Sequence, residues 1–250
     1  MNIEPFVSER DRDAVRRIWS EVGWTELDNP NRVAATDAII DTDKGFVIRQ
    51  NGEAECAVFT APGDMDYLGQ RLPLGGISAV TTSRVGRKQG YALALTAHAV
   101  AQDAAGGAIV ENLGMFEQGY YDQLGFGSGN YAHWIRFDPQ RLRVPGADRI
   151  PVRLTMNDLD EIHAARLARR RAHGSVSFHS PNQTKQRMLI APNPFVLGYR
   201  DGANGELPHF IWAYAEAVEY GPYTVMFYAF QTAEQFLELG AIGSHERGIR

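Results

Sequence analysis

Residues 74–107 contain a strand pattern, a basic loop with glycine and a helix pattern in direct succession, and this order constrains the fold most. Ile77 and Val80, followed by the β-branched Thr81 and Thr82, favour a mostly buried strand. Residues 83–90 are polar, basic and glycine-containing, and residues 92–101 are rich in alanine and leucine, which favours a helix. The pair at 106–107 is Gly-Gly, which ends that helix.

A loop of this kind before a helix predicts an anion site. The first amides of a helix have no partner within the helix, and the positive end of the helix dipole lies behind them. A pyrophosphate fits at such a position. Gly90 lets the backbone approach the anion closely, and Arg87 and Lys88 add positive charge. A solvated basic loop is the alternative interpretation of the same residues.

Two short signatures in this region carry a family resemblance. Residues 87–92, Arg-Lys-Gln-Gly-Tyr-Ala, fit the (Gln/Arg)-x-x-Gly-x-(Gly/Ala) signature of GNAT N-acetyltransferases. About thirty residues later, residues 120–126 fit the second signature of that family, aromatic-Tyr-x-x-x-Gly-Phe. The chain most resembles the Eis-type (enhanced intracellular survival) branch, which has two GNAT units in tandem. Residues 74–126 resemble that branch closely, and residues 1–53 and 150–240 resemble it loosely.

Composition limits the classes of protein that fit. A chain of 250 residues forms one large domain or two modest ones. The net charge of −5 disfavours a nucleic-acid partner, and no apolar run approaches the roughly 20 residues that span a bilayer. Cys56 is the only cysteine, and the amino terminus has no signal-peptide pattern. We therefore expect a cytoplasmic protein without disulfides, in which Cys56 is a small core residue rather than a nucleophile.

The first half of the chain follows the element order of a GNAT unit. Residues 8–11 resemble a capping box before a first helix, and Asn29-Pro30 favours the start of a second. Residues 46–60, with Asn51-Gly52 in the middle, predict a hairpin. Residues 108–112 predict a strand parallel to the one ending at Thr82, before a short helix at 117–124 and a strand at 130–137. The resemblance implies that the two parallel strands splay apart and receive the pantetheine arm of coenzyme A between them.

The second half predicts a further unit after a proline-containing linker. We expect a helix at 156–172, a polar loop at 175–183, strands at 195–200, 210–217 and 223–230, and a helix at 232–239. Residues 200–205 loosely resemble a phosphate loop, but no helix follows, so they predict a hairpin turn. The expected fold is α+β with a mixed sheet. The resemblance implies a GNAT acetyltransferase domain at 1–145 and a second, degenerate GNAT-like domain at 146–250, with one cofactor site in the first.

The resemblance also implies roles for individual residues. Tyr121 occupies the tyrosine position of the second signature and would protonate the coenzyme A sulfur as general acid. A core tyrosine beside the equally aromatic Tyr120 is the alternative. The residues that would bind acetyl-CoA are Val80, Thr81, Thr82, Arg87, Lys88, Gln89, Gly90, Tyr91, Ala92, Leu93, Phe116 and Glu117. No metal site is expected, because no His, Cys or carboxylate set has ligand spacing.

The general base is not identified by the sequence. In Eis-type enzymes the carboxylate of a third, sterol-carrier-like segment serves, and this sequence ends at Arg250, soon after the second unit. Trp24, Glu26 and Asp28, between the first two predicted helices, are candidates for contact with a cationic acceptor, although ordinary exposed loop acids are the favoured interpretation of Glu26 and Asp28. Glu111 and His133 are further candidates for the base.

The expected function is an acetyl-CoA-dependent N-acetyltransferase acting on a primary amine. The resemblance implies an aminoglycoside-like small molecule or a lysine side chain as acceptor, with direct attack on the thioester. A catalytically impaired acyl-CoA-binding module, acting as a sensor or interaction partner, is the rival interpretation, and transfer of a longer acyl group is a third. No nucleic-acid or membrane partner is expected, and the apolar run at 210–217 suggests self-association.

Overall fold

The computed structural model describes residues 2–41, 44–115, 117–129, 134–138, 141, 142, 144, 149–191, 194–215 and 221–245, with side chains of the last helix described as far as Ile242. The chain divides into two compact units. The first is Met1–Asn130 together with Ala172–Ile190, and the second is Tyr131–Arg171 together with Ala191–Arg250. The chain therefore returns once to the first unit after it has entered the second.

This return differs from the expected single boundary after residue 145. The returning segment contains β8 (Val176–Phe178) and α5 (Pro181–Ile190). β8 pairs antiparallel with β3 (Glu53–Tyr67), and α5 packs against α2 (Pro30–Ile40). The expectation of a polar loop at 175–183 was wrong, because a three-residue edge strand and a helix with mostly polar side chains leave little hydrophobic periodicity in the sequence.

A mixed sheet forms the centre of the first unit, with the strand order β1–β2–β3–β4–β5. The strands not yet given are β1 (Ile3–Pro5), β2 (Lys44–Gln50), β4 (Gln70–Thr82) and β5 (Val110–Leu113). Neighbouring strands are antiparallel except β4 and β5, which are parallel. A parallel pair requires a crossover connection, and α3 (Tyr91–Ala105) supplies it. The predicted strand, loop, helix and parallel strand are therefore confirmed.

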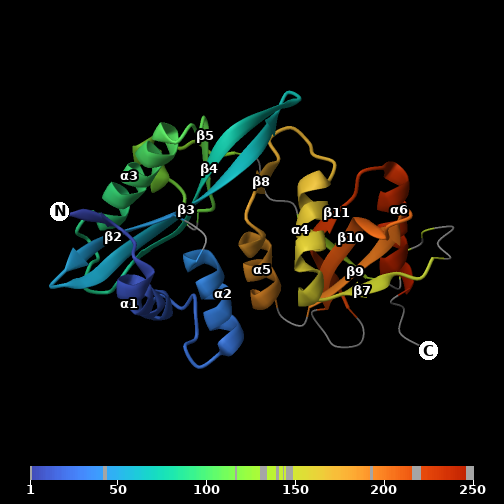
Figure 1. Cartoon of the computed structure of the whole chain (residues 1–250), viewed down its shortest axis with the longest axis horizontal. Coiled ribbons are helices and arrows are strands. Elements are labelled where there is room, and N and C mark those ends of the chain that lie inside the picture. Colours follow the sequence, from blue (N-terminus) through green and yellow to red (C-terminus); the bar gives the residue numbers. More distant parts are fainter. Residues whose placement is uncertain are drawn as a thin grey trace. The chain divides into compact units, whose positions relative to one another are not determined.

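Helices cover both faces of this sheet (Figure 1). α1 (Ser8–Glu21) and α2 lie on one face, and α3 lies on the other. Because side chains alternate along a strand, Val47 of β2 packs on the α1 face while Phe46 and Ile48 pack toward Leu95 of α3. The predicted hairpin between β2 and β3 is confirmed, with Asn51 and Gly52 at φ values of 53° and 88°.

The two predicted helix starts have different outcomes. Asn29 accepts hydrogen bonds from the amides of Asn31 and Arg32, so it caps α2 as expected. The capping box expected at residues 8–11 was wrong, because Val7 is the cap residue of α1 and no side chain caps that helix. Asp11 instead accepts from the Val7 amide at 2.9 Å and turns toward arginines.

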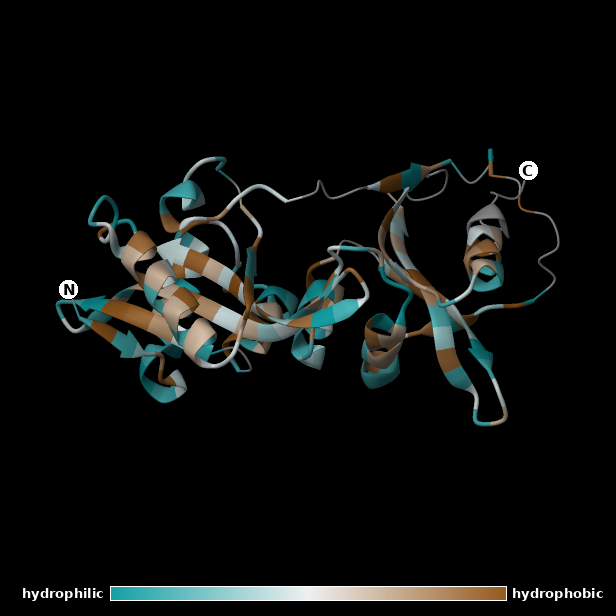
Figure 2. Ribbon diagram, turned by 90° about the horizontal axis from the view of Figure 1, so that it is seen from above, coloured by the Kyte–Doolittle hydropathy of each residue, from teal (hydrophilic) through white to brown (hydrophobic). Residues whose placement is uncertain are grey.

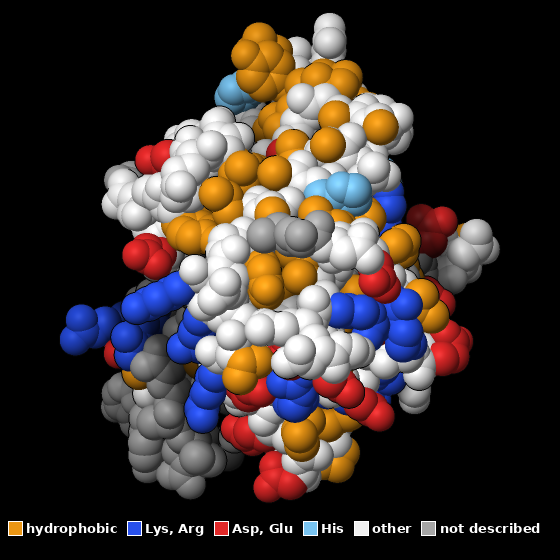
Figure 3. Space-filling model, turned by 90° about the vertical axis from the view of Figure 1, so that its left-hand side faces the viewer, with side chains coloured by type: hydrophobic (Ala, Val, Ile, Leu, Met, Phe, Trp, Pro, Cys, Tyr) orange, Lys and Arg blue, Asp and Glu red, His pale blue; other side chains and the backbone are white. Residues whose placement is uncertain are grey.

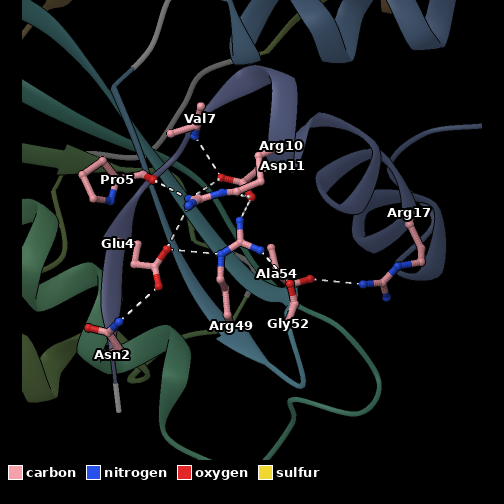
Figure 4. Close-up of polar contacts among 10 residues, drawn as sticks. All are labelled: Asn2, Glu4, Pro5, Val7, Arg10, Asp11, Arg17, Arg49, Gly52 and Ala54. Carbon is pink, nitrogen blue, oxygen red and sulfur yellow. Dashed lines mark hydrogen bonds and ion pairs between the residues drawn. The ribbon is translucent and has the colours of Figure 1, made fainter.

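A network of charged side chains joins β1, α1 and β2 (Figure 4). Asp11 is completely buried and pairs with Arg10 and Arg49, and Arg49 also reaches Glu4 at 3.2 Å. Paired and hydrogen-bonded charges of this kind are the form in which proteins tolerate a buried carboxylate. On the face drawn in Figure 3, Lys and Arg side chains lie in separate groups with acidic side chains beside them. Several arginines of the first unit form ion pairs with carboxylates.

The second unit contains an antiparallel sheet with the order β6–β11–β10–β9–β7. Its elements are β6 (Ile135–Phe137), β7 (Val152–Leu154), η2 (Met156–Asp158), α4 (Leu159–Ala168), β9 (Pro194–Asp201), β10 (Glu206–Ala215), β11 (Tyr223–Ala229) and α6 (Ala233–His245). α4 and α6 lie on opposite faces of this sheet (Figure 2). None of the described helices is both long and apolar enough to cross a membrane.

The sequence predicted most elements of the second unit. The strands at 195–200 and 223–230, the hairpin turn after Arg200 and the closing helix are confirmed as β9, β11, the β9–β10 connection and α6. The helix expected at 156–172 ends earlier, at Ala168. The strand expected at 130–137 is described only over Ile135–Phe137, and it pairs with β11 in the second sheet rather than with the first.

Candidate active site

A cavity of about 630 Å³ opens within the first unit. Residues of α1, α2, β4, β5, η1 (Tyr121–Leu124), β8 and α5 line it. Its floor includes Ser78, Ala79 and Val80 of β4, and Tyr121 faces it from η1. The cavity therefore brings together a strand, a phenol and two helix faces that lie far apart in the sequence.

A β-bulge shapes the strand under the cavity. In the pairing of β3 with β4, Ala57 lies opposite Thr81 but Phe59 lies opposite Ser78, so β4 has one extra residue here. Ala79 has a φ of 52°, in the left-handed region that residues with a side chain seldom adopt. Thr81 Oγ1 donates to the Ala79 carbonyl at 3.2 Å and accepts from Trp19 Nε1 at 3.1 Å. These bonds fix the bulge, which bends β4 where it enters the cavity.

The parallel pair β4–β5 ends at this bulge. The last paired residues are Ile77 and Leu113, and β4 continues to Thr82 without β5 beside it. β3 occupies the other edge of β4 as far as Thr82. The backbone of β4 after Ile77 consequently has one edge that β5 does not cover. An extended ligand can bind to such an edge as an added strand.

The loop between β4 and α3 is anchored at its start and open at its end. The Ser83 amide donates to the Glu55 carbonyl at 2.8 Å, and the Arg84 amide donates to the Glu21 carboxylate at 2.8 Å. Lys88 and Gly90 have φ values of 61° and 74°, and the residues from 87 to 90 are exposed. Gly90 is the cap residue of α3, and no side chain hydrogen-bonds to the first turn. A Cβ on Gly90 would meet no atom within 4 Å, so the helix start is open.

Tyr121 presents a protonated phenol to the cavity. Its ring lies edge-on to those of Tyr120, at a centroid distance of 4.9 Å, and Phe126, at 6.0 Å. Burial raises the pKa of Tyr121, with a smaller contribution from Tyr120. The side chain is therefore neutral at physiological pH and able to donate a proton. Tyr120, its neighbour, is not among the residues that line the cavity.

The family of this domain follows from a comparison of its sequence with protein-family models. Residues 6–129 match the family described as "Acetyltransferase (GNAT) domain". This part of the chain is a GNAT acetyltransferase domain. GNAT acetyltransferases use acetyl-CoA as co-substrate and transfer its acyl group to an acceptor. The open start of α3, the uncovered edge of β4 and Tyr121 all lie within or beside this domain, which supports an acyltransferase.

Solved structures with the same fold cover nearly the whole chain. A probable N-acyltransferase from Enterococcus faecalis has a TM-score of 0.74 at 17% identity, over 98% of this chain and 62% of that one. Eis1 from Mycobacterium abscessus has a TM-score of 0.76 at 16% identity, over 99% and 64%. A GCN5-related N-acetyltransferase from Kribbella flavida has a TM-score of 0.70 at 16% identity, over 98% and 61%. At these identities the likeness establishes the fold, and this chain spans less than two thirds of each of these proteins. No curated protein matches the sequence.

The residues expected to bind the cofactor lie in two places, on the strand β4 and in the loop and first turn of α3. Val80 lines the cavity, whereas the side chains of Thr81 and Thr82 bond to Trp19 and to Cys56. Arg87, Lys88, Gln89 and Gly90 form the exposed end of the loop, and Tyr91, Ala92 and Leu93 form the first turn of α3. Glu117 is exposed, and Phe116 lies outside the described residues, as does His133.

The expected acids lie outside the cavity. Glu26 and Asp28 are exposed and do not line it, although Trp24 does. Glu111 points to the α3 face of the sheet, where its carboxylate lies over Gly75 beside Asp103. Burial, with a smaller contribution from the Asp103 charge, raises the pKa of Glu111 to about 7. Among the described residues, no Asp, Glu or His lines the cavity, and no cluster suits a metal ion.

Sequence reasoning missed the wall opposite the strand. Phe178 of β8 lies against Gly76, where an added Cβ would come within 2.1 Å of the Phe178 ring. Arg32 of α2 and Arg187 of α5 also line the cavity. One signal in the sequence could have predicted this wall. It is the helical spacing of Gln183, Gln186, Arg187 and Ile190, which we did not use because we expected a loop at 175–183.

Proposed function

We propose that this chain is an acetyl-CoA-dependent N-acetyltransferase that transfers acetyl to a primary amine by direct attack. Tyr121 carries the proposal, because it lines the same cavity as the bulged part of β4 that β5 leaves uncovered. The open start of α3 beyond the end of β4 supports a diphosphate site in line with that strand. The family match supports acetyl-CoA as the co-substrate.

Each part of the domain has a distinct task in this proposal. Acetyl-CoA, when bound, supplies a thioester that an amine can attack. The first amides of α3, with Arg87 and Lys88 in the loop before it, hold the diphosphate. The backbone of Val80, Thr81 and Thr82 pairs with the pantetheine arm and polarises the thioester carbonyl. Tyr121 donates its proton to the departing thiolate, a role that its raised pKa permits.

The acceptor amine must lose a proton, and no carboxylate lies among the described residues that line the cavity. A free lysine-like amine has a pKa of about 10.4 and arrives charged. The described residues that line the cavity include no acid and no histidine, and they include Arg32 and Arg187. We propose that the proton leaves through water.

The rival proposal is an acyl-CoA-binding module without catalysis, and it is favoured because the described residues that line the cavity include no acid and no histidine. The second unit is a degenerate GNAT-like domain in both proposals, supported by its alternation of helices and strands and by structural likeness over nearly the whole chain. Its role is structural.

Release of coenzyme A thiol separates the two proposals. The purified chain is mixed with acetyl-CoA and with a panel of primary amines that includes an aminoglycoside and a lysine-containing peptide. The transferase predicts amine-dependent thiol release and an acetylated product by mass spectrometry. Binding of acetyl-CoA without release for any amine would contradict the transferase and support the module.

A further inference from the structure

The charged side chains described in the cavity are all positive. Of the described residues that line the cavity, Arg32 and Arg187 are the only charged ones. The remaining lining is apolar, aromatic or neutral and polar. A guanidinium is always charged at physiological pH, so the cavity carries positive charge at any pH at which the protein works.

The two arginines come from two helix faces that form one wall. α2 and α5 pack side by side (Figure 1), although about 150 residues separate them in the chain. On each helix the lining residues follow the i, i+3, i+4, i+7 spacing of a single face. These faces are Arg32, Ala35, Thr36 and Ile39 on α2, and Gln183, Gln186, Arg187 and Ile190 on α5. Each face thus contributes one guanidinium among small, apolar or amide side chains.

Neither arginine has an acidic partner in the described part of the chain. The acids at the far end of α2 are occupied from α1, because Arg16 pairs with Asp37 at 2.6 Å and Arg12 pairs with Asp41. α5 carries Lys185 and Arg187 and no acid. Elsewhere in this unit Arg10, Arg17 and Arg49 are all in ion pairs. Arg32 and Arg187 therefore keep their hydrogen-bond donors for a ligand.

We infer that the acceptor is a primary amine that also carries a carboxylate or phosphate group, which Arg32 and Arg187 bind. This inference rests on the proposed function and narrows its acceptor. Carboxylate and phosphate oxygens match the forked donors of a guanidinium, and such charge-assisted bonds are among the strong ones in proteins. A polyamine or aminoglycoside carries several positive charges, which the two arginines of this wall would repel. The volume of about 630 Å³, which the thioester end must share, suits a small acceptor.

A series of acceptors with one chain length tests the inference. Hexylamine, 6-aminohexanoate, 6-aminohexyl phosphate and 1,6-diaminohexane share an amine and differ at the far end. We expect kcat/KM with 6-aminohexanoate or 6-aminohexyl phosphate to exceed that with hexylamine by about 10- to 100-fold, through KM, and the diamine to be poorest. The better of the two anions identifies the anionic group. A diamine equal to or better than both anions would overturn the inference.

Variants assign the preference to the two arginines. In Arg187→Gln and Arg32→Gln the ratio of kcat/KM for 6-aminohexanoate to that for hexylamine should fall about 10-fold or more. In Arg187→Glu the diamine should become better than the anions. The matched control is Arg71→Gln, because Arg71 is exposed on β4 and does not line the cavity. An unchanged ratio in both pocket variants would overturn the role of the arginines.

Binding of an unreactive anion separates this inference from the proposed function. Hexanoate and hexyl phosphate lack an amine, so their binding can be measured by calorimetry whether or not transfer occurs. Binding of either to wild type, weakened in Arg187→Gln and kept in Arg71→Gln, would support the anion site even if no amine is acetylated. Transfer to amines with no binding of either anion would support the function and overturn the inference.

Discussion

The role that we propose for Tyr121 depends on its surroundings as well as on its place in a motif. The phenol is partly buried between the rings of Tyr120 and Phe126, and burial raises its pKa. A general acid must hold its proton until the leaving group needs it, and a raised pKa serves this purpose. The sequence pointed to Tyr121 through a signature, with a core tyrosine beside Tyr120 as the alternative. In the structure Tyr121 lines the cavity and Tyr120 does not.

Replacing Tyr121 by phenylalanine removes the proton and keeps the ring. We expect Tyr121→Phe to lower kcat for thiol release by about 10²- to 10⁴-fold, the usual contribution of an acid–base group. Tyr120→Phe is the matched control and should keep kcat within a few-fold of wild type. Equal kcat for wild type and Tyr121→Phe would refute the role of Tyr121.

At the scale of elements, α3 and β5 bring two carboxyl groups close together, those of Asp103 and Glu111. Thr60 of β3 donates a hydrogen bond to Asp103 of α3, whereas both carboxylate oxygens of Glu111 are buried without a hydrogen-bond partner in the described structure. An ideal Cβ on Gly75 would lie 2.5 Å from Glu111 Oε1 and 2.6 Å from Asp103 Oδ2, so the acids share one space. The sequence predicted the strand containing Glu111. It could not predict this pairing, because Asp103 and Glu111 meet only when α3 crosses back over the sheet.

The buried acid makes stability fall as pH rises. The pKa of Glu111 is about 7 in the folded protein and about 4.5 when unfolded, so between these values the unfolded chain has released the proton that the folded one keeps. Stability therefore decreases from about pH 4.5 to pH 7, by at most about 3 kcal/mol and by less where solvent screens the charge.

Glu111→Gln removes this charge and tests the effect. We expect the free energy of unfolding of Glu111→Gln to exceed that of wild type by about 1–3 kcal/mol at pH 8, with the difference fading toward pH 4.5. Urea unfolding at several pH values measures it. The comparison variant is Glu117→Gln, since Glu117 is exposed. A difference for Glu111→Gln that is constant with pH would contradict the assignment.

At the scale of the whole molecule, the sequence predicted elements that are contiguous in the chain and missed the segment that returns to the first unit after the chain has entered the second. The strand, loop and helix around Gly90 are contiguous, so local patterns and two signatures were enough for them. The wall of β8 and α5 depends on a segment that comes back after residue 171, and its polar residues resemble a loop. Arg187 was missed for this reason. The bulge at Ala79 was missed because its positive φ falls on a residue that ordinarily avoids it.

The fold of both units is shared with larger proteins of known structure. This chain spans between 61% and 64% of three solved structures that share its fold. Their likeness extends over both of its units, and the family match covers residues 6–129 alone. We therefore propose a single co-substrate site in the GNAT domain and none in the second unit.

A calorimetric titration with acetyl-CoA measures whether this single site exists. We compare wild type with Gly90→Asp, which puts a carboxylate at the open start of α3, and with Gly69→Asp as control, because Gly69 has a similar φ of 78° and equally open space at the β3–β4 turn. We predict one equivalent of acetyl-CoA bound per chain, a Kd raised at least about 10-fold in Gly90→Asp, and an unchanged Kd in Gly69→Asp. No heat with wild type, two equivalents, or equal Kd values for both variants would contradict it.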